Sequence, residues 1–121
     1  MTSISNSADL SFPDQDVVGM RIDRENSIAV LSMTGAWLNG PVGKGDLILS
    51  HWRALQQRRF ASGKNLWLEI PHGSEEPLKD ICEFIIDDDI ICLRGFGKNS
   101  GEWIEMRFNG GQACWAAGST G

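Results

Sequence analysis

The chain has 121 residues, of which 41% are hydrophobic and 22% charged, as expected for one ordinary globular domain. Its net charge of −5 argues against a nucleic-acid partner, because phosphate contacts need a surplus of Lys and Arg. No apolar stretch approaches the ~20 residues of a transmembrane helix, and the polar start of the chain does not resemble a secretory signal. The three cysteines, Cys82, Cys92 and Cys114, match no metal, haem or disulfide spacing. We therefore expect a cytoplasmic protein with reduced thiols and with no cofactor, metal or membrane partner.

Residues 1–15 have no hydrophobic period and predict a loose N-terminal leader, in which Leu10 and Phe12 are candidates for docking on the body. Residues 16–22 and 27–34 are rich in β-branched side chains and flank a polar connection, which predicts a hairpin. We expect a single α+β domain over residues 16–117, followed by a C-terminal tail at 118–121.

Residues 47–61 have the pattern of an amphipathic helix. Asp46 is suited to the N-cap and Gly63 to the position after the last turn. One stripe at helical spacing consists of Ile48, Trp52, Leu55 and Arg59. This segment is predicted to be the main helix of the domain.

The second half of the chain predicts mostly strands. Residues 65–70 alternate between apolar and other side chains up to Pro71, and a short second helix is expected from Ser74 to Cys82. A β-meander follows, with strands at 82–86, 90–96, 102–108 and 112–117 and a tight turn at Asn109-Gly110. The predicted fold class is α+β: a mostly antiparallel sheet of six to seven strands, with one main amphipathic helix packed on one face and a short second helix.

One face of this predicted sheet has an unusual composition for a solvated surface. If the apolar side chains of 66–70 and 104–108 face the core, alternation places another set on the opposite face: Trp67, Glu69, Trp103, Glu105 and Arg107. Tryptophan with charged groups is typical of a ligand cleft or a protein interface. The alternative is that a curled sheet makes this face the core.

A second candidate surface is acidic, since residues 69–89 contain eight acids and a single base, Lys79. Its predicted partner-binding carboxylates are Glu75, Glu76, Asp80, Asp87, Asp88 and Asp89. Such a surface complements a basic protein, as in small acidic inhibitors of nucleases.

Catalytic signatures are lacking. The glycine-rich residues 39–45 fail the phosphate-loop pattern, and the two histidines, His51 and His72, have no recognisable triad partners. Glu69 and Glu105 are the one carboxylate pair considered for acid–base chemistry. The leading hypothesis is a non-catalytic binding or interaction module, such as an inhibitor or adaptor of a basic protein. The alternatives are a small-molecule-binding protein or weakly signposted enzyme with a Trp-lined cleft, and a homodimer-forming protein.

Overall fold

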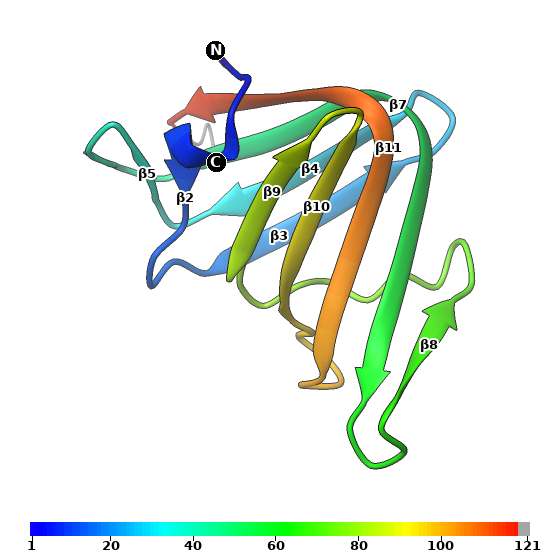
Figure 1. Ribbon diagram of the computed structural model, residues 1–121. Helices are drawn as coiled ribbons and strands as arrows, with labels where there is room; N and C mark the ends of the chain where they lie inside the picture. Colours follow the sequence, from blue (N-terminus) through cyan, green and yellow to red (C-terminus); the bar gives the residue numbers. More distant parts are fainter. Residues whose placement is uncertain (119–121) are drawn as a thin grey trace.

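The computed structural model describes residues 1–118, and these form an almost entirely β protein (Figure 1). The strands are β1 (Thr2–Ile4), β2 (Leu10–Ser11), β3 (Val17–Asp23), β4 (Ile28–Met33), β5 (Ala36–Leu38), β6 (Pro41–Val42), β7 (Gly45–Ala61), β8 (Leu66–Ile70), β9 (Glu83–Asp87), β10 (Ile90–Phe96) and β11 (Trp103–Ala117). The single helical element within residues 1–118 is the 3-10 turn η1 (Ser7–Asp9). In the same residues, no helix has the length and apolar character needed to cross a membrane.

An eight-stranded antiparallel sheet has the order β3-β4-β7-β11-β10-β9, with β8 added to β7 and β1 added to β11. A small three-stranded sheet has the order β2-β5-β6. The long strands β7 and β11 pair along almost their whole length and bend together, so they run through both halves of the large sheet (Figure 1). One half of the large sheet contains β3, β4 and β1 and is built on residues 45–50 of β7. The other half contains β8, β10 and β9 and is built on residues 54–61 of β7; we call it the β8–β9 half.

The bend of β7 and β11 is a β-bulge. The register shifts where Asn109 pairs with Ala54 but Gly110 pairs with Trp52, so Arg53 is an extra residue. An extra residue increases local twist and bends the strand. His51 has φ 62°, Gly110 φ 77° and Gly111 φ 100°. A Cβ at Gly111 would lie 2.7 Å from the Ser50 carbonyl oxygen, so the close approach of β11 to β7 at the bend requires glycine.

The predicted main helix at 47–61 is wrong, because these residues form β7. The strand buries Leu47 and Leu49, then Trp52, then Leu55 and Gln57. Around the bend, successive buried positions are twice separated by three residues, from Leu49 to Trp52 and from Trp52 to Leu55. The residues His51 and Arg53 shift the phase of the alternation there. A period of two with these shifts resembles helical spacing over a short window. The fold class is therefore not α+β, although the predicted antiparallel sheet is present.

The predicted second helix is also absent. Residues 71–82 form an irregular segment without a helix, in which Leu78 and Asp80 make isolated bridges to Gly97 and Asp16. The Pro77 carbonyl accepts from the Lys98 amide, a partner distant in sequence rather than one in a helical turn. Leu78 is fully buried, so the segment covers the inner face of the β8–β9 half and closes the core.

The predicted turn at Asn109-Gly110 lies inside the continuous strand β11. A type I′ turn needs positive φ at both central residues, whereas here the two successive residues with positive φ are Gly110 and Gly111. Glycine in this sequence therefore marks the bulge rather than a chain reversal.

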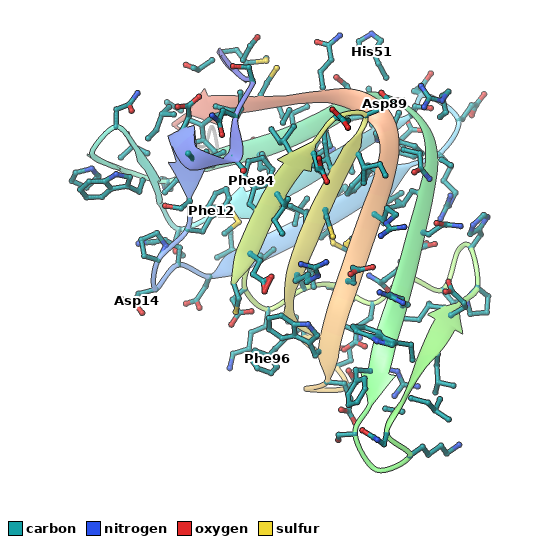
Figure 2. The ribbon with its side chains drawn as sticks, in the orientation of Figure 1. Phe12, Asp14, His51, Phe84, Asp89 and Phe96 are labelled. Atoms are coloured by element: carbon teal, nitrogen blue, oxygen red, sulfur yellow. The ribbon has the colours of Figure 1, made fainter. Side chains whose placement is uncertain are left out.

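Residues 1–15 were expected to form a loose leader in which Leu10 and Phe12 could dock. Both side chains are buried, but the segment is part of the sheet structure rather than loose, because β1 pairs with β11. The strands β1 and β2 have three residues or fewer, too short to show a period. Phe12 contacts Phe84 edge to face, with ring centroids 6.1 Å apart, and Figure 2 labels both rings between β2 and β9. Of the expected tail at 118–121, residues 119–121 lie outside the described residues, and the Gly118 amide donates to the Lys44 carbonyl.

Candidate functional site

Four aromatic side chains form a row across the outer face of the β8–β9 half. Phe96 pairs with Trp103, Trp103 with Phe60, and Phe60 with Trp67, so β10, β11, β7 and β8 each supply one ring. Phe96 and Trp103 are 5.1 Å apart between ring centroids, and Phe60 and Trp67 are 5.4 Å apart, both edge to face. The row ends in exposed rings, since Phe96 is 43% exposed and Trp67 is 36% exposed. We call these four residues the aromatic row.

A row of alternating charges lies beside the aromatic row, two residues away from it along β10, β11, β7 and β8. Directly paired positions across β9, β10, β11, β7 and β8 are Glu83, Arg94, Glu105, Arg58 and Glu69. Opposite charges at paired positions stabilise a sheet, whereas like charges there destabilise it. Recorded ion pairs join Glu83 to Arg94 at 3.0 Å and Glu105 to both arginines at 2.9 Å. We call these five residues the charge ladder.

Glu105 is the centre of the charge ladder and is only 3% exposed. Burial opposes ionisation of its carboxyl, but the hydrogen bonds from the Nε atoms of Arg58 and Arg94 outweigh burial and lower its pKa. The same hydrogen bond to Glu105, followed by the one to Glu83, raises the pKa of Arg94. Glu105 is therefore a permanently charged structural group at neutral pH and is unsuited to act as a general acid.

Arg58 connects the charge ladder to the aromatic row. Its Nε donates to Glu105 Oε1 at 2.9 Å, and its guanidinium carbon lies 4.1 Å from the ring centroid of Trp67. A guanidinium in this position is attracted by the negative face of the indole. Trp67 is thus held in a fixed orientation although its ring is exposed, which lowers the conformational entropy that a partner would have to remove on binding.

A small polar pocket adjoins the charge ladder, lined by Gln56, Arg58, Glu69, Glu105 and Arg107. Its volume is about 120 Å³, and neither indole contributes to its lining. Drug-sized ligands occupy pockets of about 300–1,000 Å³. This pocket therefore does not form the predicted Trp-lined cleft between Trp67 and Trp103.

The five residues singled out from the sequence lie on one face, away from the core. Ile104, Met106 and Phe108, which alternate with Trp103, Glu105 and Arg107, are fully buried on the opposite face. Trp67 and Trp103 belong to the aromatic row, and Glu69 and Glu105 to the charge ladder. Arg107 is exposed on the same face, two residues beyond Glu105 along β11, where it pairs with Gln56 and Cys92.

Sequence reasoning missed Phe60, Arg58, Phe96, Arg94 and Glu83. Phe60 and Arg58 were assigned to a helix, which hid their strand partners. The other three lie in the predicted meander, but its turns at 87–89 and 97–101 give a register that is one residue out. Counting back from those turns pairs Glu83 with Leu93 and Phe96 with Glu102, whereas the structure pairs Glu83 with Arg94 and Phe96 with Trp103.

The six acidic residues predicted as a partner surface do not form one patch. Glu75 binds Arg24, and although burial opposes its ionisation, the hydrogen bond from Arg24 lowers its pKa. Glu76 Oε2 accepts from the amides of Asn99 and Ser100. Asp80 Oδ1 accepts from the Phe96 amide at 2.9 Å. These three carboxylates hold the 71–82 segment and the 97–101 turn in place.

Asp87 ends β9, and Asp88 and Asp89 form the exposed turn to β10, where Asp89 pairs with Arg53. Figure 2 shows Asp89 and Phe96 at opposite ends of β10, and Phe96 is the residue that Asp80 binds. The seven residues of β10 separate the two acidic groups by about 20 Å. The acidic residues therefore form two separate groups rather than one continuous patch.

Residues considered for catalysis are not assembled into a site. His51 is exposed at the outside of the bend, next to the Ser50 hydroxyl, and His72 is exposed in the 71–82 segment (Figure 2). Cys92 is buried beside the charge ladder, at the position paired with Arg107, where burial and the charge of Glu105 raise its pKa to about 11. A thiol with such a pKa is largely protonated at neutral pH and a poor nucleophile.

No protein-family model matches the chain, and comparisons with curated proteins and with solved structures found no match either.

Proposed function

We propose that the protein is a non-catalytic binding module and that its partner-binding surface is the aromatic row together with the adjoining Glu69 and Arg107. The observation that carries this proposal is the alignment of four aromatic rings at paired positions of four strands, on a face that the core does not use. Cross-strand aromatic pairs contribute modestly to the stability of a sheet, but that contribution does not require rings as exposed as Trp67 and Phe96 at the ends of the row. Three strand spacings of ~4.8 Å give it a length of about 14 Å.

A protein partner fits this surface better than a small molecule does. Aromatic side chains and arginine are the residues enriched in the energetically dominant parts of protein interfaces. The pocket beside the row holds only about 120 Å³. Orientation of Trp67 by Arg58 further suits the surface to a partner that is bound without rearrangement.

A basic partner is supported by the charge distribution. The protein carries a net charge of −5, and both ends of the charge ladder are exposed carboxylates, Glu83 and Glu69. Complementary charges accelerate association and favour the correct partner more than they raise affinity. An acidic inhibitor or adaptor of a basic protein has these properties.

The proposal is tested by affinity capture from cells that produce the protein, comparing wild type with the double variant Trp67→Ala/Phe96→Ala. Both rings are exposed, so the double variant is expected to fold. The matched control is Trp37→Ala, which removes an indole that is 48% exposed on β5, outside this face.

Proteins retained by wild type and by Trp37→Ala, but lost with the double variant, would support the aromatic row as the binding surface. Retention that weakens steeply as salt rises would identify a basic partner. A partner retained equally by all three chains would show that the row is not the surface.

A further inference from the structure

The strand β8 has an uncovered edge. Within residues 1–118, β8 pairs with β7 alone, so one row of its amide and carbonyl groups faces outward (Figure 1). The opposite edge strand, β9, lies beside β2 and η1, and β3 lies beside the 71–82 segment through the bridge at Asp16. An unpaired edge is a template for another strand, and proteins usually block it with Lys, Pro or a bulge. None of these devices occurs between Leu66 and Ile70.

Apolar side chains are accessible on both faces of β8. Leu66 is 43% exposed on the inner face, where Leu68 and Ile70 are half-buried, and Trp67 is exposed on the outer face. The β7–β8 hairpin projects from the body of the molecule, so no other strand shields it (Figure 1). A strand with this composition loses exposed apolar area on both faces when a second strand pairs with it.

We propose that two copies of the chain associate by antiparallel pairing of β8 with β8, centred on Leu68. This register places Leu66 opposite Ile70 and Trp67 opposite Glu69 of the second copy. All inner-face pairs are then apolar, and no like charges are directly opposed. The five residues of β8 are self-complementary in this one register, whereas a shift by two places Glu69 or Trp67 opposite its own counterpart.

Charge complementarity also identifies a second copy as the occupant. Arg58 lies over Trp67 and uses Nε for Glu105, while no partner is recorded within residues 1–118 for its two terminal nitrogens. Glu69 is exposed and makes no recorded ion pair in the same residues. Pairing about Leu68 brings Glu69 of the second copy beside Trp67, within reach of the free side of Arg58. Each copy supplies both groups, so two equivalent ion pairs form.

This inference rests on different observations from the proposed partner surface, although Trp67 and Glu69 belong to both. Continuous pairing through β8 places the two aromatic rows on the same face of one extended sheet. A partner with two suitable sites can then contact both aromatic rows at once, which raises its overall affinity above that for a single row.

Association is measured by sedimentation velocity over a wide range of protein concentration. Wild type is expected to shift from monomer to dimer as concentration rises. Leu66→Lys introduces a charge among the apolar inner-face pairs, and Glu69→Lys places a positive charge beside Arg58 of the second copy. Each is expected to raise the dimer dissociation constant at least tenfold. The matched control, Val18→Lys, changes an exposed apolar residue on the edge strand β3 and is expected to leave the dissociation constant unchanged.

The register is tested by disulfide formation in a Cys82→Ser background, which removes the exposed native thiol. Leu68→Cys is expected to form an interchain disulfide under mild oxidation, because residues paired directly across antiparallel strands have Cα atoms about 4.5–5.5 Å apart. Leu66→Cys is expected not to, since its counterpart is Ile70. A wild type that stays monomeric at all concentrations, a dimer unaffected by Leu66→Lys, or crosslinking at 66 instead of 68 would each overturn the proposal. None of these results bears on whether Phe96 and Trp67 hold a partner.

Discussion

Gln57 and Glu76 exchange two hydrogen bonds in the interior of the protein. The Gln57 Nε2 donates to the Glu76 carbonyl at 2.8 Å, and its Oε1 accepts from the Glu76 amide at 2.7 Å. Gln57 is the one side-chain amide among the buried residues of 1–118. Its amide group binds the backbone of the 71–82 segment as a neighbouring strand would. This contact fixes the segment over the inner face of the sheet, under the charge ladder.

Gln57→Leu is therefore expected to lower the free energy of unfolding by roughly 1–3 kcal/mol, since it leaves a buried amide and carbonyl of Glu76 without partners. Urea denaturation measures the change. The neighbouring Gln56→Leu, on the exposed outer face, should change it by less than about 0.5 kcal/mol. Equal effects of the two substitutions would contradict the role given to Gln57.

Replacing Glu105 tests the charge ladder. Glu105→Gln keeps the shape of the side chain but leaves Arg58 and Arg94 without their shared anion. The loss is expected to be about 2 kcal/mol, less than for a fully buried pair because both arginines are partly exposed. Glu69→Gln, at the exposed end of the same row, should have almost no effect on the monomer. Chemical denaturation at low protein concentration distinguishes these outcomes.

The same carboxyl predicts a pH dependence. The pKa of Glu105 in the folded protein lies below its ordinary value of 4.5, so its contribution to stability is complete above that value. It is lost as pH falls through the lower, folded pKa. Glu75 has a lowered pKa and acts in the same direction. The free energy of unfolding should be nearly level from pH 7 to about 5 and should fall at lower pH. The fall should be less steep in Glu105→Gln. Identical slopes for the two proteins would refute the contribution assigned to Glu105.

Gly111→Ala tests the bend of β11. The φ of 100° is unfavourable for alanine, and the added Cβ would lie 2.7 Å from the Ser50 carbonyl oxygen. We expect a loss of at least about 2 kcal/mol in thermal or chemical unfolding. Gly43→Ala, where a Cβ meets nothing within 4 Å and φ is not positive, serves as the comparison and should be nearly neutral. A tolerated Gly111→Ala would mean that the bend does not depend on glycine.

Thiol labelling tests the environment of the cysteines. Cys82 is exposed but its pKa is raised, by partial burial first and by the charge of Asp80 second. Cys92 is buried with a pKa of about 11. In native protein, a disulfide reagent should modify Cys82 first and Cys92 last, with Cys82 slower than a free thiol in solution. Mass spectrometry of the partly labelled chain gives the order, and early modification of Cys92 would show that the charge ladder opens.

The hairpins around residues 23–27, 87–89 and 97–101 could be predicted because their signals are local, with short polar turns between β-rich runs. The outward set with Trp103 could be placed because strict alternation holds from 102 to 108. β7 could not be recognised, since the phase shifts at His51 and Arg53 depend on a bulge that only the partner strand reveals. The partners of Trp67 and Glu105 on β7 were missed for the same reason.

The acidic segment shows a different limit of sequence reasoning. Counting charges between Glu69 and Asp89 treats every carboxylate as free, but Glu75, Glu76 and Asp80 bind groups that are distant in sequence, at Arg24, Asn99 and Phe96. Composition gives the charge of a segment and not the contacts that occupy it.

The two long strands that run through both halves of the large sheet have a consequence for how the molecule comes apart. β7 and β11 supply the central strands of each half, so neither half has a complete set of strands without the other. A chain cut within β7 at the bend would leave half of β7 on each fragment and all of β11 on the second, so neither fragment could close its own core. We therefore expect the protein to unfold as one cooperative unit, with the slowest amide exchange along the two central strands on both sides of the bend.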